Sequence, residues 1–187
     1  MFSLLVKNGF IPEKGFSLEI SGPPGSGRRI PIWRAVEELS SERVLYLDLA
    51  GRYTHLLRTS GEAPETVDLY TSPSPYDAFS LILGGSYGLV VLDSIPRLFF
   101  DMEASYRARW GLTALVLDAG LRLALKGGRF IAVNYASRRP FGETFFAHFF
   151  THRVSASLGE EGLRLKKLYP GSGEIVLGGV RGWRGVR

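Results

Sequence analysis

Residues 16–29 read FSLEISGPPGSGRR, and they contain the sharpest motif of the chain. Its first six residues form a short strand pattern, and a helical pattern begins at about residue 30. The glycine-rich run GPPGSG joins the two. A glycine-rich turn between a strand and a helix is the context of a phosphate-binding loop, because backbone N–H groups at the helix N-terminus can surround phosphate oxygens.

The run fits the pattern GxxxxGK[ST] in its glycines, but not in the two residues that carry the chemistry. Arg28 replaces the lysine, and Arg29 replaces the hydroxyl residue that binds magnesium. Arginine contacts phosphate through a planar fork rather than a compact ammonium, and no group at position 29 can ligate magnesium. A glycine-rich turn that binds nothing explains this stretch about equally well.

A second motif lies at 89–94, LVVLDS, where a hydrophobic strand pattern ends in Asp93. In phosphoryl-transfer enzymes an aspartate in this position orients the magnesium shell. Strands that end in Asp are common, but strand–helix units separate this one from the glycine-rich run, which makes the pair more specific. The candidate nucleotide-binding residues are Gly22, Gly25, Ser26, Gly27, Arg28, Arg29 and Asp93.

Strand and helix patterns alternate along most of the chain. The expected strands are 16–21, 43–49, 66–70, 87–92 and 129–134, and the expected helices are 30–39, 75–83 and 106–125. After residue 140 the stretches HRVSASL, GLRLKKLY and GEIVLGGV predict an antiparallel meander. The fold class is therefore α/β, with a mostly parallel central sheet, helices on both faces and a C-terminal antiparallel extension.

The 187 residues have the size and composition of one globular domain, with a lead-in at 1–15 and a basic tail at 181–187. The absence of cysteine excludes disulfides, thiolate metal sites and cysteine nucleophiles. No apolar run approaches the roughly 18–20 residues of a membrane helix, and the N-terminus lacks the arrangement of a signal peptide. We expect a cytoplasmic protein without a membrane partner.

Charge is distributed unevenly. The net charge is +5, but residues 1–120 carry −3 and residues 121–187 carry +8. A basic C-terminal third suggests a polyanion partner or an acidic protein surface, although a solvated face explains it equally well. The chain has 18 arginines, no glutamine and two asparagines. Scarce amides fit a thermophile, although GC-rich coding would also favour arginine.

With these two motifs, the chain resembles the ATPase core of the RecA/RadA recombinase superfamily, and particularly its short paralogues, such as RadB and the KaiC-like proteins. The stretches that carry the resemblance, in order, are LVKNGFIPEKGFSLEISGPPGSG (5–27), VLYLDLAGRY (44–53), YGLVVLDSI (87–95), RFIAVNYASRRP (129–140) and GETFFAHFFTHRVSASL (142–158). The resemblance implies a RecA-like P-loop fold, ATP and Mg²⁺ as cofactors, and DNA and other recombinases as partners.

The chain departs from the family at its catalytic positions. Ala50 stands where family ATPases carry the glutamate that polarises water, and Tyr135 stands where the glutamine that senses the γ-phosphate follows Asn134. With Arg28 and Arg29, four groups needed for phosphoryl transfer are absent. We therefore expect no catalytic residues, no efficient hydrolysis and at most weak binding of ATP and Mg²⁺, with the two arginines as candidates to fill the phosphate space.

Two segments match the places where family members contact single-stranded DNA, PRLFFDMEASYRARW (96–110) and ASRRPFG (136–142). Arginines interleaved with aromatic residues suit a strand whose phosphates need charge and whose bases can stack. The alternative is that the aromatic residues are core or face a partner, and that the arginines are only solvated. The candidate DNA-binding residues are Arg107, Arg109, Arg138 and Arg139, with Arg181 and Arg184 in the tail.

We expect a catalytically degenerate paralogue that acts as an accessory factor in homologous recombination and DNA repair. It would bind DNA, single-stranded DNA by preference, and a recombinase or paralogue protein, as a homodimer or heteromer. Two alternatives stay open, a weak or partner-dependent ATPase and a KaiC-like regulatory module with no DNA role. We expect no metal site, because an i,i+4 pair such as His148 and His152 would be about 13 Å apart if it lay along a strand.

Overall fold

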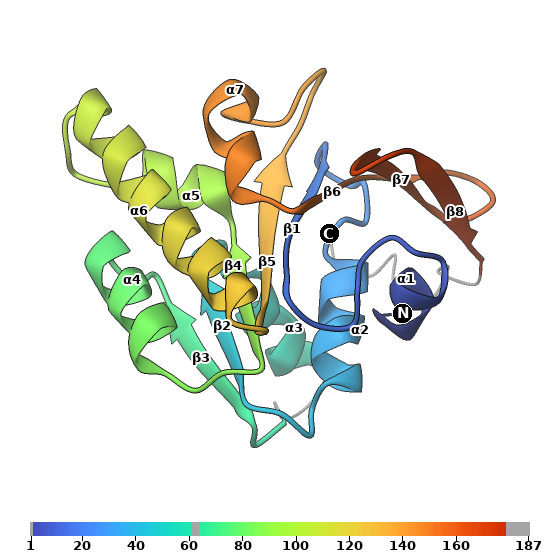
Figure 1. Ribbon diagram of the computed structural model, residues 1–187, viewed down its shortest axis with the longest axis horizontal. Helices are drawn as coiled ribbons and strands as arrows, with labels where there is room; N and C mark the ends of the chain where they lie inside the picture. The colour runs from blue at the N-terminus through green and yellow to red at the C-terminus, as the bar shows by residue number, and fades with distance from the viewer. Residues whose placement is uncertain (1, 61–63, 179–187) are drawn as a thin grey trace.

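The computed structural model describes residues 2–60 and 64–178 (Figure 1). Its strands are β1 (Phe16–Gly22), β2 (Val44–Asp48), β3 (Val67–Thr71), β4 (Leu89–Asp93), β5 (Arg129–Tyr135), β6 (His152–Leu158), β7 (Leu163–Tyr169) and β8 (Gly173–Leu177). Its helices are α1 (Phe2–Lys7), α2 (Ile30–Glu38), α3 (Arg52–Ser60), α4 (Pro75–Gly84), α5 (Ile95–Phe100), α6 (Tyr106–Leu125), α7 (Glu143–Phe146) and the 3₁₀ turn η1 (Ala147–Phe149).

The strands form one eight-stranded sheet in the order β3-β2-β4-β5-β1-β6-β7-β8. The first six strands in this order are parallel, and β7 runs antiparallel to both β6 and β8. The predicted α/β class, the mostly parallel sheet and its antiparallel C-terminal extension are therefore confirmed. No helix among the described residues has the length and apolarity needed to cross a bilayer.

The sheet separates two apolar cores, because alternate side chains of each strand point to opposite faces. In β2, Val44 and Tyr46 belong to the core beneath α1, α2 and α3, whereas Leu45 and Leu47 belong to the core beneath α4, α5 and α6. Figure 1 shows these two helical groups on either side of the sheet. Burial on both faces explains the nearly continuous apolar runs of β2 and β4.

Four helices that the sequence patterns did not predict lie at strand ends or in the lead-in, namely α1, α3, α5 and α7. Each has nine residues or fewer, which is too short for a clear helical period. By contrast, the long helix α6 begins and ends where the sequence predicts it. Ser105 caps its first turn by accepting a hydrogen bond from the Ala108 N–H, and Gly127 follows its end in a left-handed conformation.

The parallel strands bring the two candidate functional regions to one edge of the sheet. Asp48 pairs in register with Asp93, and Gly22 pairs with Tyr135. The loops that follow β1, β2, β4 and β5 therefore start at the same edge, where ligands of open α/β sheets bind. The predicted phosphate-type loop and the 136–142 segment lie in these loops, and the 96–110 segment follows β4 as most of α5 and the start of α6.

Candidate functional site

The loop between β1 and α2 has the turn that its glycines predict. Gly25 and Gly27 adopt left-handed φ angles of +78° and +72°. Gly22 has no room for a side chain, because a Cβ atom there would lie 2.4 Å from Ser26 Oγ and 2.6 Å from the Ala156 carbonyl oxygen. The glycine pattern is therefore required by the shape of the loop, whether or not a ligand binds.

Arg29 forms a two-pronged ion pair with Asp93, the aspartate at the end of β4. Its Nε donates to Oδ2 at 2.6 Å, and its Nη2 donates to Oδ1 at 2.7 Å. The Tyr46 hydroxyl donates to the same Oδ2 at 3.2 Å. The Asp93 side chain is fully buried and that of Arg29 is 19% exposed, so the pair is largely shielded from water. Both carboxylate oxygens are thus occupied by donors of the protein itself.

The electrostatics agree with this pairing. Burial opposes the charge of Arg29, but its hydrogen bonds to Asp93 and the nearby carboxylate charge outweigh burial and raise the pKa of the guanidinium. Burial, and then the charge of Asp93, raise the pKa of the Tyr46 phenol well above its usual value. At neutral pH, Arg29 is therefore a cation and Tyr46 a neutral donor beside a single carboxylate.

Arg28 points into the loop rather than toward Asp93. Its Nη1 donates to the carbonyl oxygens of Gly22 at 2.9 Å and Pro23 at 2.6 Å. Burial, and then the charge of Arg29, lower the pKa of Arg28 to about 10. Within the described residues, Ser26 Oγ and Arg28 Nε are buried without a hydrogen-bond partner. These two side-chain groups could donate hydrogen bonds to an anion only if the loop opened, because both are buried.

The residues present do not fit the magnesium–nucleotide group that the resemblance implies. Both oxygens of Asp93 already accept hydrogen bonds from Arg29 or Tyr46 and the side chain is fully buried, so a metal ion would first have to displace Arg29. Position 29, where the pattern GxxxxGK[ST] has the magnesium-binding hydroxyl, is an arginine. A phosphate group would also have to displace Arg28 from the loop carbonyls.

Asp48, the acid at the end of β2, does not act as a free base either. Its carboxylate accepts hydrogen bonds from the Arg52 N–H at 3.0 Å, the Thr54 N–H at 2.8 Å and the Thr54 hydroxyl at 2.8 Å. These bonds hold the first turn of α3. Asp48 is therefore engaged at the end of its strand and does not replace the missing glutamate.

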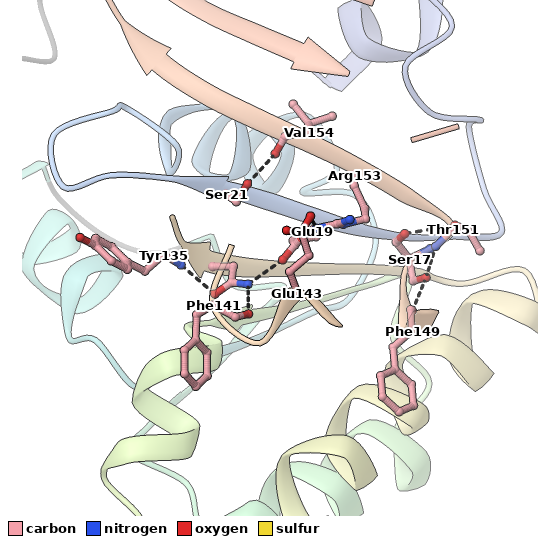
Figure 2. A network of polar contacts seen from close by, with 11 residues as sticks. Ser17, Glu19, Ser21, Tyr135, Phe141, Glu143, Phe149, Thr151, Arg153 and Val154 are labelled. Atoms are coloured by element: carbon pink, nitrogen blue, oxygen red, sulfur yellow. Dashed lines mark hydrogen bonds and ion pairs between the residues drawn. The ribbon is translucent and has the colours of Figure 1, made fainter. Parts of the chain in front are cut away.

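A buried polar network joins β1, β5 and β6 (Figure 2). Asn134 Nδ2 donates to Glu19 Oε1 at 2.6 Å and to the Phe141 carbonyl at 2.9 Å. Arg153 Nε donates to Glu19 Oε2 at 2.7 Å, and its Nη2 reaches Glu143 at 3.2 Å. The network ties the end of the 136–142 loop, at Phe141, and α7 to the centre of the sheet.

The structure brings the two predicted DNA segments together through a cluster of aromatic rings. The Trp110 ring lies 4.8 Å from that of Phe99, 5.9 Å from Phe141 and 5.2 Å from Phe145. Phe100 and Phe141 are 5.2 Å apart. The segment after β4 and the segment after β5 therefore pack against each other, although about 30 residues separate them in the chain.

Part of this cluster is exposed to solvent, and the segments that form it also carry exposed arginines. Phe100 is 55% exposed, Tyr106 67% and Phe145 44%. Arg107, Arg138 and Arg139 are exposed, and none of the three forms a hydrogen bond or ion pair with the residues that the structure describes. We call these six residues the aromatic–basic surface. Arg138 and Arg139 lie at the tip of a short hairpin closed by a bridge between residues 136 and 140.

The other three candidate DNA-binding arginines are not part of this surface. Arg109 is half-buried, and its Nε donates to the Ala104 carbonyl at 2.9 Å, so it stabilises the turn between α5 and α6. Arg181 and Arg184 lie outside the described residues. Within 2–60 and 64–178, no group of three His, Asp or Glu side chains is placed to hold a metal ion.

Sequence reasoning missed the partners that complete both buried sites. Tyr46 looks like an ordinary core residue within an apolar strand, and nothing in its pattern points to Asp93. Glu19 and Arg153 are 134 residues apart, so no local pattern links them. A charged residue at an otherwise apolar strand centre, as at Glu19, is the one signal that could have been followed. The chain matches no protein-family model, and a search of curated protein sequences finds no significant match.

Proposed function

We propose that this protein is a catalytically degenerate relative of the RecA/RadA recombinases. It binds single-stranded DNA through the aromatic–basic surface and serves as an accessory factor in recombination and repair. The observation that carries the proposal is the convergence of exposed rings and unpaired arginines from the two predicted DNA segments. The glycine-rich loop after β1 and the aspartate at the end of β4, on a mostly parallel sheet, support the relationship.

The chemistry of the surface favours a single strand over a duplex. Exposed rings can stack on unpaired bases, which a duplex keeps inside its own stack. Unpaired arginines can contact phosphates without first breaking an ion pair. Neither kind of contact reads a base edge, so the proposed binding is tolerant of sequence.

Hydrolysis of ATP is not part of the proposed function. Asp93 is engaged by Arg29, Asp48 caps α3, and Ala50 and Tyr135 cannot supply a base or a phosphate sensor. Even if a partner protein supplied the missing groups, the buried ion pair between Arg29 and Asp93 would still engage the aspartate.

A second feature supports the protein partner in the proposal. The outer edge of β3 is unpaired among the described residues, and beside it β3 and α4 border an open groove of about 830 Å³. Residues lining this groove include Tyr70, Ser72, Asp77 and Tyr87. An unpaired strand edge can accept an extended segment of another chain by strand addition. A recombinase or paralogue is the partner that fits the proposed role.

Replacing the three free arginines of the aromatic–basic surface, as R107A/R138A/R139A, is expected to weaken DNA binding about 10- to 100-fold at low salt. The slope of log K against log salt should also fall by about 2, because three phosphate contacts are lost. Fluorescence anisotropy with a labelled oligothymidine measures both. The matched control R58A/K126A/K166A removes the same charge from other exposed positions. Equal losses in the two variants would contradict a local site.

Alanine at Phe100, Tyr106 or Phe145 is expected to weaken the same complex about tenfold while leaving the salt slope unchanged. The reason is that a ring contributes stacking rather than counterion release. A flat response to both sets of variants, together with retained binding to a recombinase or paralogue, would favour the KaiC-like alternative without a DNA role.

A further inference from the structure

The fully buried carboxylate of Asp93 needs a cation beside it, because an unpaired charge in the interior is strongly unfavourable. In this chain the cation is a side chain, since Arg29 contacts both oxygens of Asp93 at 2.6 and 2.7 Å. We propose that Arg29 is the permanent cation of this site: it takes the place of a divalent metal, and with Arg28 across the loop it makes the folded state independent of magnesium and of nucleotide.

A tethered guanidinium has two advantages over a free ion at this position. It is held near Asp93 by the backbone of the loop, so its effective concentration does not depend on the solution. Its planar fork also matches the carboxylate in a two-pronged geometry, which Mg²⁺ cannot reproduce while it keeps its own water shell. A magnesium ion would have to expel a largely buried arginine before it reached Asp93.

Tyr46 completes the arrangement from β2. Its hydroxyl donates to Asp93 Oδ2, and its ring stacks on that of Tyr53 with centroids 4.2 Å apart. The ring is fixed by this stacking and is fully buried. A neutral donor in this place suits a carboxylate that already has its counter-charge, whereas a metal shell would call for an acceptor.

Arg28 has a different role in the loop. It binds the carbonyls of Gly22 and Pro23, so its guanidinium covers the loop instead of joining the ion pair. Among the described side chains of the loop, Ser26 Oγ and Arg28 Nε are buried without a hydrogen-bond partner. Independence from magnesium and nucleotide is a property of the folded loop, and it holds whether or not the aromatic–basic surface binds DNA.

The wild-type protein tests the proposal directly. Thermal unfolding is followed in EDTA, and then with MgCl₂, MnCl₂, Mg-ATP, Mg-ADP and sodium phosphate, each against KCl at the same ionic strength. We expect Tm to stay within about 1 °C of the matched control in every case. A saturable rise in Tm of about 3 °C or more with any divalent ion, nucleotide or phosphate would overturn the proposal.

Two substitutions at position 29 separate a tethered cation from a merely structural side chain. Arg29→Lys keeps a cation on the chain and should fold with no response to divalent ions. Arg29→Thr removes it, and its lowered Tm should rise by about 5 °C or more, saturably, with millimolar Mg²⁺ or Mn²⁺. Arg97→Thr, at an exposed pair with Asp101, is the control and should respond to neither ion.

A folded Arg29→Thr protein that ignores both ions would contradict the proposal. If that variant does not fold in any buffer, the wild-type and Arg29→Lys series decide. Unchanged Tm values in both support the proposal, and a divalent-dependent rise in either overturns it.

Discussion

Replacing Arg29 with alanine is expected to lower the free energy of unfolding by about 3–5 kcal/mol. The substitution leaves the fully buried carboxylate of Asp93 with the Tyr46 hydroxyl as its remaining donor. An uncompensated buried charge costs much more than the net contribution of an intact pair. Urea unfolding in EDTA measures the loss, because urea is uncharged and the chelator prevents a divalent ion from replacing the missing cation.

The matched control for this prediction is Arg122→Ala. Arg122 also pairs with an aspartate at 2.6 Å, but its side chain is 65% exposed on α6. We expect that loss to be about 0.5 kcal/mol or less. A double-mutant cycle with Asp93→Asn should show that most of the cost of Arg29→Ala disappears when the carboxylate is absent. Equal losses at Arg29 and Arg122 would contradict the interpretation of a buried pair.

Removing Arg153 is the second large effect that the structure predicts, with an expected loss of about 3 kcal/mol in the free energy of unfolding for Arg153→Ala. Glu19 is 2% exposed at the side chain and lies in β1 between β5 and β6. Without Arg153 its carboxylate keeps the hydrogen bond from Asn134 but no counter-charge.

Adding Glu19→Gln to Arg153→Ala should recover part of the loss, because a neutral amide needs no cation. Arg164→Ala is the control. Arg164 also contacts two carboxylates, those of Glu161 and Glu174 at 3.5 and 3.4 Å, but all three side chains are exposed. Its loss should stay below about 1 kcal/mol. A recovery that fails to appear in the double variant would show that lost packing, and not the buried charge, dominates at Arg153.

These two buried pairs support different elements. The Arg29–Asp93 pair joins the glycine-rich loop to the end of β4. The Glu19–Arg153 pair, with Glu143 and Asn134, holds α7 and the start of the hairpin that carries Arg138 and Arg139. The variants of the second pair should therefore also weaken DNA binding, whereas those of the first should act on stability alone.

Much of the fold follows from local patterns. The glycine-rich loop, the aspartate at the end of β4 and the long helix α6 could all be predicted, because glycine content, strand apolarity and helical period are properties of neighbouring residues. The start of β4 was predicted two residues early, at residue 87 rather than Leu89. Gly88 instead hydrogen-bonds to the Arg43 carbonyl, and Arg43 lies over the Tyr87 ring.

The short helices show where local patterns stop being sufficient. The sequence of α3, RYTHLLRTS, is polar and nine residues long, and its start is determined by Asp48 in the preceding strand end. A segment of this length gains its helical stability from its cap and its packing rather than from its own composition. That information lies outside the segment.

Residue types alone show that two arginines replace the lysine and the hydroxyl of a phosphate-type loop, and that aromatic and basic residues share two later segments. What these residues contact depends on the tertiary structure. It pairs Arg29 with an aspartate 64 residues away and turns Arg28 onto the loop carbonyls. It also packs Phe100 against Phe141, so that rings and arginines from both segments form one surface. The physical reason is that residue types and spacing are local, whereas the partner of a buried charge depends on which strands lie side by side.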